Sequence, residues 1–187
     1  MSPVLSTFSG ASARAFGFGY SLASSAFEHI ETQTVGAGGA ASVTFSSIPG
    51  TYKHLQIRAL VRLGTDGQGL RLTTNSGTLV RRHYLYGDGG PNAAAGADTN
   101  NGLFYLTYAS QLASTFGAAV IDILDYTSTT KNSTIRSLTG YDLNTTAGSV
   151  GLFSQLYTSS AAITSITLTA SSGNINQHST FALYGCK

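Results

Sequence analysis

The clearest hydrophobic pattern in the chain is an alternation over residues 53–62. The positions on one side of an extended chain are aliphatic: Leu55, Ile57, Ala59 and Val61. The positions on the other side are polar: His54, Gln56, Arg58 and Arg62. Leu60 is the exception on the polar side. Because successive side chains of a β-strand point to opposite faces, the pattern predicts a strand with one buried and one solvated face.

Similar apolar and β-branched segments recur along the chain, separated by turn signals. About nine or ten strands are predicted, over residues 28–35, 41–47, 53–62, 70–74, 103–108, 117–126, 134–143, 150–157, 163–170 and 181–184. Strands and helices do not alternate, which argues against a parallel α/β sheet. The sequence therefore predicts an all-β fold: an antiparallel two-sheet sandwich, jelly-roll-like, formed by residues 28–187.

Three connecting segments carry expectations of their own. Residues 64–67 contain the pair Asp66-Gly67, which is typical of a hairpin turn. Residues 78–86 fit a short helix or a strand equally well. Residues 87–102 hold five glycines and one proline, so they predict a surface loop. We also expect residues 117–126 and 134–143 to form a hairpin, with Lys131 in its loop.

Residues 1–27 differ in composition from the rest of the chain. Ser, Ala and Gly dominate, and large aromatic side chains are spaced among them without a period of 2 or 3.6. Each aromatic side chain gains about 1.5–3 kcal/mol on burial, so it needs a surface to pack on. We expect an extended N-terminal arm that docks on a partner, with these candidate contacts: Phe8, Arg14, Phe16, Phe18, Tyr20 and Phe27. A strand packed along its own sandwich is the alternative.

Composition and charge exclude several classes of protein. Only 10% of the residues are charged, whereas coiled coils and long exposed helices need many more. The hydrophobic content of 42% is too high for a disordered chain. A net charge of +2 is too small for a nucleic-acid binder, and no apolar run approaches the about 20 residues of a membrane-spanning helix. We expect neither nucleic acid nor membrane insertion.

Basic residues concentrate between Lys53 and Arg82, where Asp66 is the only acid. Five arginines are candidate contacts for a neighbouring subunit or an acidic partner: Arg58, Arg62, Arg71, Arg81 and Arg82. The alternative is the solvated outer face of two paired strands. Four tyrosines flank the predicted loop and are candidates for stacking on a glycan: Tyr84, Tyr86, Tyr105 and Tyr108. Packing in the core or in an interface is the favoured alternative for these rings.

No arrangement of residues indicates catalysis. Asp122 and Asp125 are three positions apart, which places them on opposite faces of a regular strand. We expect a structural role, with Asp125 bonding backbone at a turn. The four histidines are far apart and Cys186 is the only cysteine, so no metal-ligand spacing exists. We expect no cofactor.

Several stretches resemble modules of bacteriophage virion proteins. They are residues 41–58 (ASVTFSSIPGTYKHLQIR), 83–89 (HYLYGDG), 121–126 (IDILDY) and 181–187 (FALYGCK). Residues 10–18 (GASARAFGF) resemble the start of tail or fibre-type phage proteins. The resemblance implies a non-enzymatic component of the virion, on the tail or the capsid exterior, that contacts other virion proteins. Fibre and spike modules of this kind are often trimeric, so a homotrimer is expected.

The sequence and the resemblance together favour a tail-associated fibre or spike subunit. The subunit would dock through its N-terminal arm and oligomerise through its sandwich, and a glycan of the host surface is a candidate partner. A capsid decoration protein that cements neighbouring capsomers is the alternative. A glycan-binding or glycan-cleaving tail module ranks lower, because few acids are available for a carboxylate pair.

Overall fold

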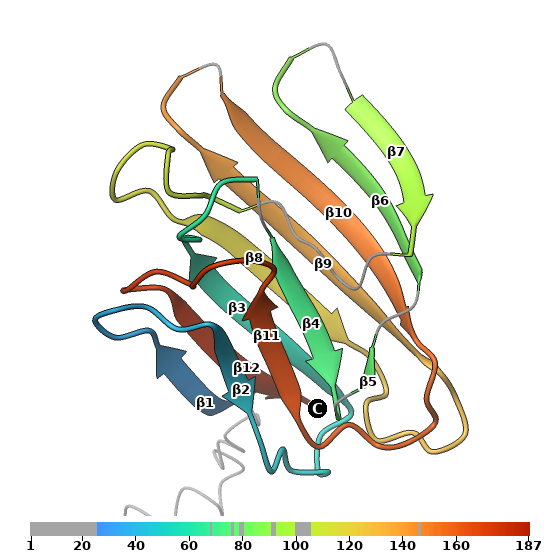
Figure 1. The fold of residues 1–187 in the computed structure, drawn as a ribbon. Coiled ribbons are helices and arrows are strands. Elements are labelled where there is room, and N and C mark those ends of the chain that lie inside the picture. Colours follow the sequence, from blue (N-terminus) through green and yellow to red (C-terminus); the bar gives the residue numbers. More distant parts are fainter. Residues whose placement is uncertain are drawn as a thin grey trace, which may run out of the picture.

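The computed structural model describes residues 26–67, 69–75, 77–78, 81–90, 93–99, 106–145 and 147–187. Within these residues the fold is all-β, with twelve strands in two antiparallel sheets (Figure 1). The large sheet contains β1 (Phe27–Thr34), β3 (His54–Val61), β6 (Arg81–Gly87), β7 (Ala93–Asp98), β8 (Gly117–Ile123), β9 (Ser133–Asp142), β10 (Gly148–Tyr157) and β12 (Thr180–Cys186). The small sheet contains β2 (Ser42–Phe45), β4 (Leu70–Thr74), β5 (Gly77–Thr78) and β11 (Ile166–Ala170). None of the described residues forms a helix that could span a membrane.

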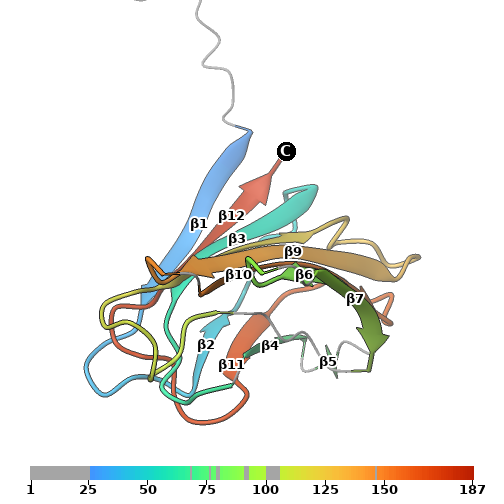
Figure 2. The same ribbon diagram turned by 90° about the horizontal axis from the view of Figure 1, so that it is seen from above.

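Eight of the strands have jelly-roll connectivity. Four strands of the large sheet lie in the order β1-β12-β3-β8, and the small sheet, whose order is β2-β11-β4-β5, lies against one side of the large sheet (Figure 2). The chain changes sheet between β1 and β2, between β2 and β3, between β3 and β4, and again between β11 and β12. This exchange between two antiparallel layers is the defining feature of a jelly roll. The predicted jelly-roll-like sandwich is therefore confirmed.

The other four strands widen the large sheet beyond β8. Two insertions supply them: β6 and β7 follow β5, and β9 and β10 follow β8. Continuing from β8, they lie in the order β9-β10-β6-β7, and neighbouring strands are antiparallel. The large sheet therefore has eight strands against four in the small sheet, and Figure 2 shows it as the broader layer.

The hydrophobic core lies between the two sheets. On β3, the side chains of Leu55, Ile57 and Val61 are buried, as the alternation predicted. On the small sheet, Ile166 and Leu168 of β11 are also fully buried and belong to the same core. Each such side chain contributes about 1.5–3 kcal/mol through burial. Hydrophobic contact between the layers is thus the main source of stability for the sandwich.

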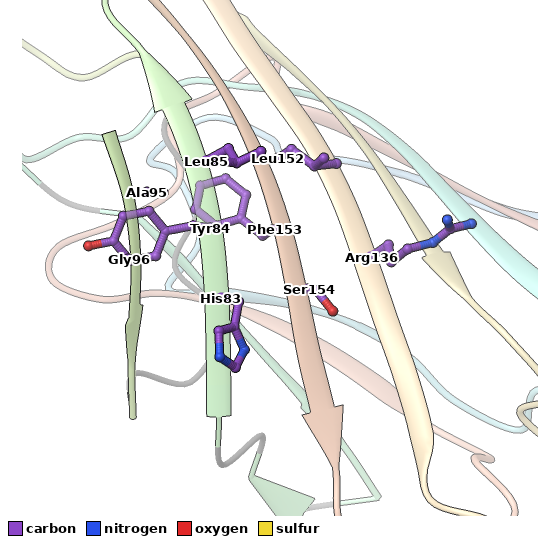
Figure 3. Close-up of a pocket in the computed structure, with 9 residues that line it drawn as sticks. All are labelled: His83, Tyr84, Leu85, Ala95, Gly96, Arg136, Leu152, Phe153 and Ser154. Carbon is purple, nitrogen blue, oxygen red and sulfur yellow. The ribbon is translucent and has the colours of Figure 1, made fainter. Parts of the chain in front are cut away.

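The predicted surface loop over residues 87–102 contains a strand, which corrects that prediction. β7 lies inside this segment and pairs antiparallel with β6. Its sequence is rich in alanine, which has low β-propensity, so the pattern did not indicate a strand. Gly96 has a specific reason to be glycine. A Cβ atom at Gly96 would lie 2.7 Å from Cζ of Tyr84, and its absence leaves room for that ring against β7 (Figure 3).

Two further expectations are settled by the sheet order. The predicted turn at residues 64–67 is present, with Gly67 at a positive φ, but it does not form a hairpin, because the flanking strands β3 and β4 belong to different sheets. Within the ambiguous segment 78–86, residues 81–86 belong to a strand, because β6 begins at Arg81. The hairpin predicted for residues 117–126 and 134–143 is confirmed by the antiparallel pairing of β8 and β9.

The predicted strand over residues 103–108 is described only in part. Residues 103–105 lie outside the described residues. Thr107 forms an isolated bridge with Arg62, and its hydroxyl donates a hydrogen bond to the carbonyl oxygen of Val61 at 2.8 Å. This contact ties the start of the 108–116 loop to the end of β3.

At several positions the widened part of the large sheet departs from the usual polarity of its two faces, although Ile135 and Phe153 are buried in the core. On β9, the hydroxyl side chains of Ser137 and Thr139 point inward and are 3% and 2% exposed, whereas Leu138 between them is 52% exposed. On β10, Gln155 also points inward and is buried. Neither hydroxyl nor either amide atom of Gln155 has a hydrogen-bond partner among the described residues. An antiparallel sheet normally places apolar residues on its inner face and polar residues in solvent. Here, instead, an aliphatic side chain, Leu138, lies on the outer face of the sheet.

Candidate functional site

The outer face of the large sheet carries a continuous row of aliphatic side chains across four neighbouring strands. Leu85 on β6 pairs with Leu152 on β10, Leu152 pairs with Leu138 on β9, and Leu138 pairs with Val120 on β8. Directly opposite side chains in a sheet lie about 4.5–5.5 Å apart, so these four form one contiguous strip. All four are exposed, from 36% for Val120 to 56% for Leu85.

A second apolar row runs parallel to the first. Val150 on β10 and Leu60 on β3 are its large members, and both are exposed. Between and beside them the row contains small residues: Gly87, Ala93, Ala118 and Gly140. We call the exposed aliphatic residues of the two rows the apolar face, and they are Leu60, Leu85, Val120, Leu138, Val150 and Leu152.

The large exposed apolar residues gather on this side of the molecule. Among the described residues eight such side chains are exposed, and Phe27 and the six of the apolar face account for seven of them. The eighth, Leu112, lies outside the strands, between β7 and β8. A contiguous exposed apolar patch marks an interaction site, whereas single exposed leucines are normal.

The apolar face is hollowed over its small residues. One depression of about 460 Å³ is lined by Leu85, Leu138, Val150 and Leu152, together with Tyr86, Gly87, Ala93, Ala94 and Ala95. A second depression of about 390 Å³ lies beside it, and Figure 3 shows the residues that line it. There Leu85 and Leu152 lie close together, while Arg136 extends away from them. Both depressions suit apolar side chains of a partner better than a charged ligand.

A polar row borders the apolar face on one side. Arg136 on β9 pairs across the sheet with Asp122 on β8, and Asp122 pairs with Gln56 on β3. The amide of Gln56 donates a hydrogen bond to Asp122 Oδ1 at 2.8 Å, and Arg58 Nε donates one to Gln56 Oε1 at 2.8 Å. This row therefore holds charges of both signs, as the rim of a protein interface usually does.

Aromatic residues occupy the opposite end of the outer face, at β1 and β12. The guanidinium of Arg58 lies 4.8 Å from the ring centre of Phe27 and 4.9 Å from that of Tyr184. His29 packs edge-on against Tyr184 at 5.7 Å. Arg58 is thus held by cation–π contacts within its own chain.

Of the residues predicted to dock the N-terminal arm, only Phe27 lies within the described part of the chain. Phe27 is the first residue of β1 and pairs with Cys186, so it belongs to the sandwich and not to the predicted arm. This moves the expected boundary between arm and domain back by at least one residue. The other predicted arm contacts lie outside the described residues: Phe8, Arg14, Phe16, Phe18 and Tyr20.

Arg62 does not contribute to an exposed basic patch, which corrects its predicted outward position. It is buried, and its guanidinium donates four hydrogen bonds to main-chain carbonyls of the 108–116 loop. The strand alternation breaks at this point because β3 ends at Val61. The planar guanidinium, with five donors, therefore fixes the path of a loop.

Arg82 is also internal, which corrects a second prediction. It forms an ion pair with Asp98 on β7, and its guanidinium lies 4.9 Å from the ring centre of Tyr84. Its neighbour Arg81 points to the outer face and is exposed, whereas Arg71 is exposed on β4 of the small sheet. The five arginines thus fall on different surfaces, and the predicted outer face of two paired strands does not exist, because β3 and β4 are not paired.

The tyrosines expected to stack on a glycan do not form one platform. Tyr84 and Tyr86 share the inner face of β6, both are part-buried, and Tyr84 packs 6.3 Å from Phe153. Tyr108, in the 108–116 loop, has its ring centre 6.3 Å from that of Tyr141, near the end of β9. Tyr105 lies outside the described residues. Internal packing, the favoured alternative, accounts for Tyr84.

The polar side chains that could support chemistry are engaged in separate structural contacts. The carboxylate of Asp125 accepts a hydrogen bond from Lys131 Nζ at 2.6 Å, and its main-chain N–H donates one to His54 Nδ1 at 3.0 Å. The expected backbone partner for this carboxylate is therefore replaced by Lys131, which lowers the pKa of Asp125. Burial raises the pKa of the Cys186 thiol. Among the described residues no group of three His, Cys, Asp or Glu side chains is placed to hold a metal ion.

Comparison with known proteins gives no relative. No protein-family model, curated protein or solved structure matches this chain.

Sequence reasoning missed the apolar face, although the sequence contains a signal for it. Leu60 already stood out as an apolar residue on a polar side. The adjacent pairs Val120-Ile121 and Leu152-Phe153 place an apolar residue on each face of their strands. Strands that are apolar on both faces are typical of sheets covered on both sides.

Proposed function

We propose that this chain is a non-enzymatic structural subunit of a bacteriophage particle, of the tail-associated fibre or spike type. The observation that supports the proposal is the apolar face, because an exposed apolar surface of this extent marks a site of protein contact. The stretches that resemble phage virion proteins include parts of β3, β6, β8 and β12, which are strands of the same sheet.

The architecture suits a subunit whose role is to hold neighbours in place. The jelly roll provides a rigid core, and the inserted strands β6, β7, β9 and β10 widen one layer into a broad surface. The side chains exposed there are short and aliphatic, so little rotamer entropy is lost when they are covered. A surface of this kind gains free energy from contact area and needs no reactive group.

The test is to find the chain on the particle. Antibodies raised against the purified chain are applied to phage particles from the strain that carries the gene, and bound gold label is located by electron microscopy. We expect label on the tail, and we expect peptides of the chain in the mass spectrum of purified particles. Label on the capsid shell would favour a decoration protein instead, and absence from purified particles would reject the proposal.

A second assay addresses the non-enzymatic part of the proposal. The purified chain is incubated with capsular and lipopolysaccharide preparations of the host, and reducing ends and polymer length are measured. We expect no change in either. Shortening of a polysaccharide, lost when the chain is heat-denatured, would show a glycan-cleaving module.

A further inference from the structure

The apolar face requires a cover, because its exposure conflicts with the polarity of the strands that build it. Leu138 is exposed while its neighbours Ser137 and Thr139 are buried without hydrogen-bond partners among the described residues. A strand in water would be more stable with these positions exchanged. The outward leucine is favoured only when another apolar surface lies against it.

The outer face has the size that a stable protein interface needs. The eight strands are about 4.8 Å apart and about seven residues long at about 3.3 Å per residue, so the whole outer face, with the apolar face on five of its strands and polar residues around it, has a footprint of about 900 Å². A stable interface takes about 800 Å² from each partner. The face also has the arrangement of an interface, since an aliphatic centre lies beside a polar row that contains Arg136 and Asp122.

The shape of the face is complementary to itself. Its projections are leucine side chains, such as Leu85 and Leu152, and its depressions lie over small residues, such as Gly87 and Ala93. Both kinds of feature occur side by side in one patch. A copy turned by a two-fold rotation can therefore set its leucines into the depressions of the first, which is how isologous interfaces are built.

The charges beside the face also favour an identical partner. The bordering row contains one arginine and one aspartate on neighbouring strands, Arg136 and Asp122. A strongly acidic or strongly basic partner would meet a like charge on this row. An identical copy presents both signs, so opposite charges can meet across a two-fold axis.

We propose that the apolar face binds a second copy of this chain, face to face across a two-fold axis. The inference rests on the proposed structural function, because it names the partner of the surface that supports that function. It replaces the expected homotrimer with an isologous dimer as the basic unit. The dimer buries the leucines of both copies in one central layer.

The experiment measures self-association of the full chain by sedimentation velocity and light scattering, over about 1–100 µM, a range that suits an interface of this size. We expect twice the chain mass at the upper concentrations. The variant with both Leu138→Glu and Leu152→Glu is expected to weaken association at least about a hundredfold. Leu112→Glu is the matched control, because Leu112 is 53% exposed, close to the 52% of Leu138, but lies off the face.

A milder variant keeps the test independent of folding. Leu138→Thr introduces a β-branched side chain suited to a strand, so its circular dichroism spectrum should match that of the original chain. We expect it to weaken association by about tenfold. If it associates as tightly as the original chain while the double variant is unfolded, the proposal is overturned.

Other occupants of the face give distinct results. Phe16→Ser with Phe18→Ser should leave association unchanged, and loss of the dimer in this variant would assign the face to the N-terminal segment instead. Flotation with phosphatidylcholine vesicles should leave the chain unbound, and binding that the Leu138→Glu and Leu152→Glu variant abolishes would assign the face to lipid.

Failure of the inference can be told apart from failure of the proposed function. A monomer at every concentration, or a trimer mass, overturns the two-fold pairing. Either result leaves the proposed function intact if the chain is found on purified particles. Absence from the particle with a dimer in solution would reject the function and retain the pairing.

Discussion

The guanidinium of Arg62 is the clearest place to test how the sandwich holds the 108–116 loop. Its Nη1 atom donates to the carbonyls of Leu112 at 2.7 Å and Thr115 at 2.9 Å. Its Nη2 atom donates to those of Ala109 at 3.1 Å and Gln111 at 2.8 Å. The residue is only 8% exposed, so water cannot easily replace these contacts. We therefore choose Arg62→Lys, which keeps the charge and removes the planar fork.

The expected loss follows from the number of carbonyls that lose a donor. A lysine ammonium has three donors on one atom and cannot reach four carbonyls spread along a loop. A hydrogen bond to a charged group contributes about 1.5–3 kcal/mol, and at least two of the four at Arg62 should be lost. We expect Arg62→Lys to lower the free energy of unfolding by about 3–6 kcal/mol.

Urea unfolding, followed by far-ultraviolet circular dichroism at a fixed protein concentration, measures this loss. The concentration is held constant because any self-association also stabilises the fold. Arg58→Lys is the control, since Arg58 is exposed and its guanidinium stacks on Phe27 and Tyr184. Its effect should stay below about 1 kcal/mol. A loss under about 1 kcal/mol for Arg62→Lys, with unchanged amide exchange in residues 109–116, would refute the assigned role.

Three further substitutions test other contacts. Gly185→Ala should lower stability by about 1–3 kcal/mol in urea unfolding, because the new Cβ would lie 2.2 Å from Cγ of Tyr52. Gln155→Met should raise stability by about 1–3 kcal/mol, because it removes two buried amide atoms that lack partners among the described residues. Lys131→Met should raise the pKa of Asp125, measured by carboxyl-carbon NMR titration, because the hydrogen bond from Lys131 is the main cause of its lowered value. Folding lowers the pKa of Asp125. The difference in free energy of unfolding between the original chain and the Lys131→Met variant should therefore be present at pH 7 and vanish as the pH falls through the folded-state pKa of Asp125.

Each of these substitutions has a control within the chain. Gly36→Ala introduces a Cβ with no atom within 4 Å, so it should be close to neutral. Gln177→Met changes an exposed amide and should not add stability. Lys53→Met removes a smaller influence on Asp125 and should move its pKa less than Lys131→Met does. Equal effects in a variant and its control would contradict the corresponding argument.

The sequence was informative where one face of a strand meets the core and the other meets water. The alternation of β3 predicted its buried residues, and the recurrence of such segments predicted the antiparallel sandwich. It failed for β7, because alanine and glycine form that strand through pairing with β6 and not through their own preference. It also placed Arg62 in solvent, since nothing local shows that a distant loop folds back over the end of β3.

The apolar face was missed for a related reason. Alternation identifies a strand by contrast between its faces, and β10 has little contrast, with Leu152 outward beside Phe153 inward. Which of the two faces the core depends on the register with neighbouring strands. That register is a property of the assembled sheet and not of any one strand.

Three neighbouring strands, β8, β9 and β10, each direct an aliphatic side chain to the outer face at the same level of the sheet. A shift of β9 by one residue would turn Leu138 inward and Ser137 outward, but it would also expose Ile135 and bury Arg136. The same shift would break the row in which Leu138 lies between Val120 and Leu152. Each of these three strands places an exposed aliphatic residue at the same level of the sheet. An exposed aliphatic row on three neighbouring strands supports the proposed partner, which would lie against all three.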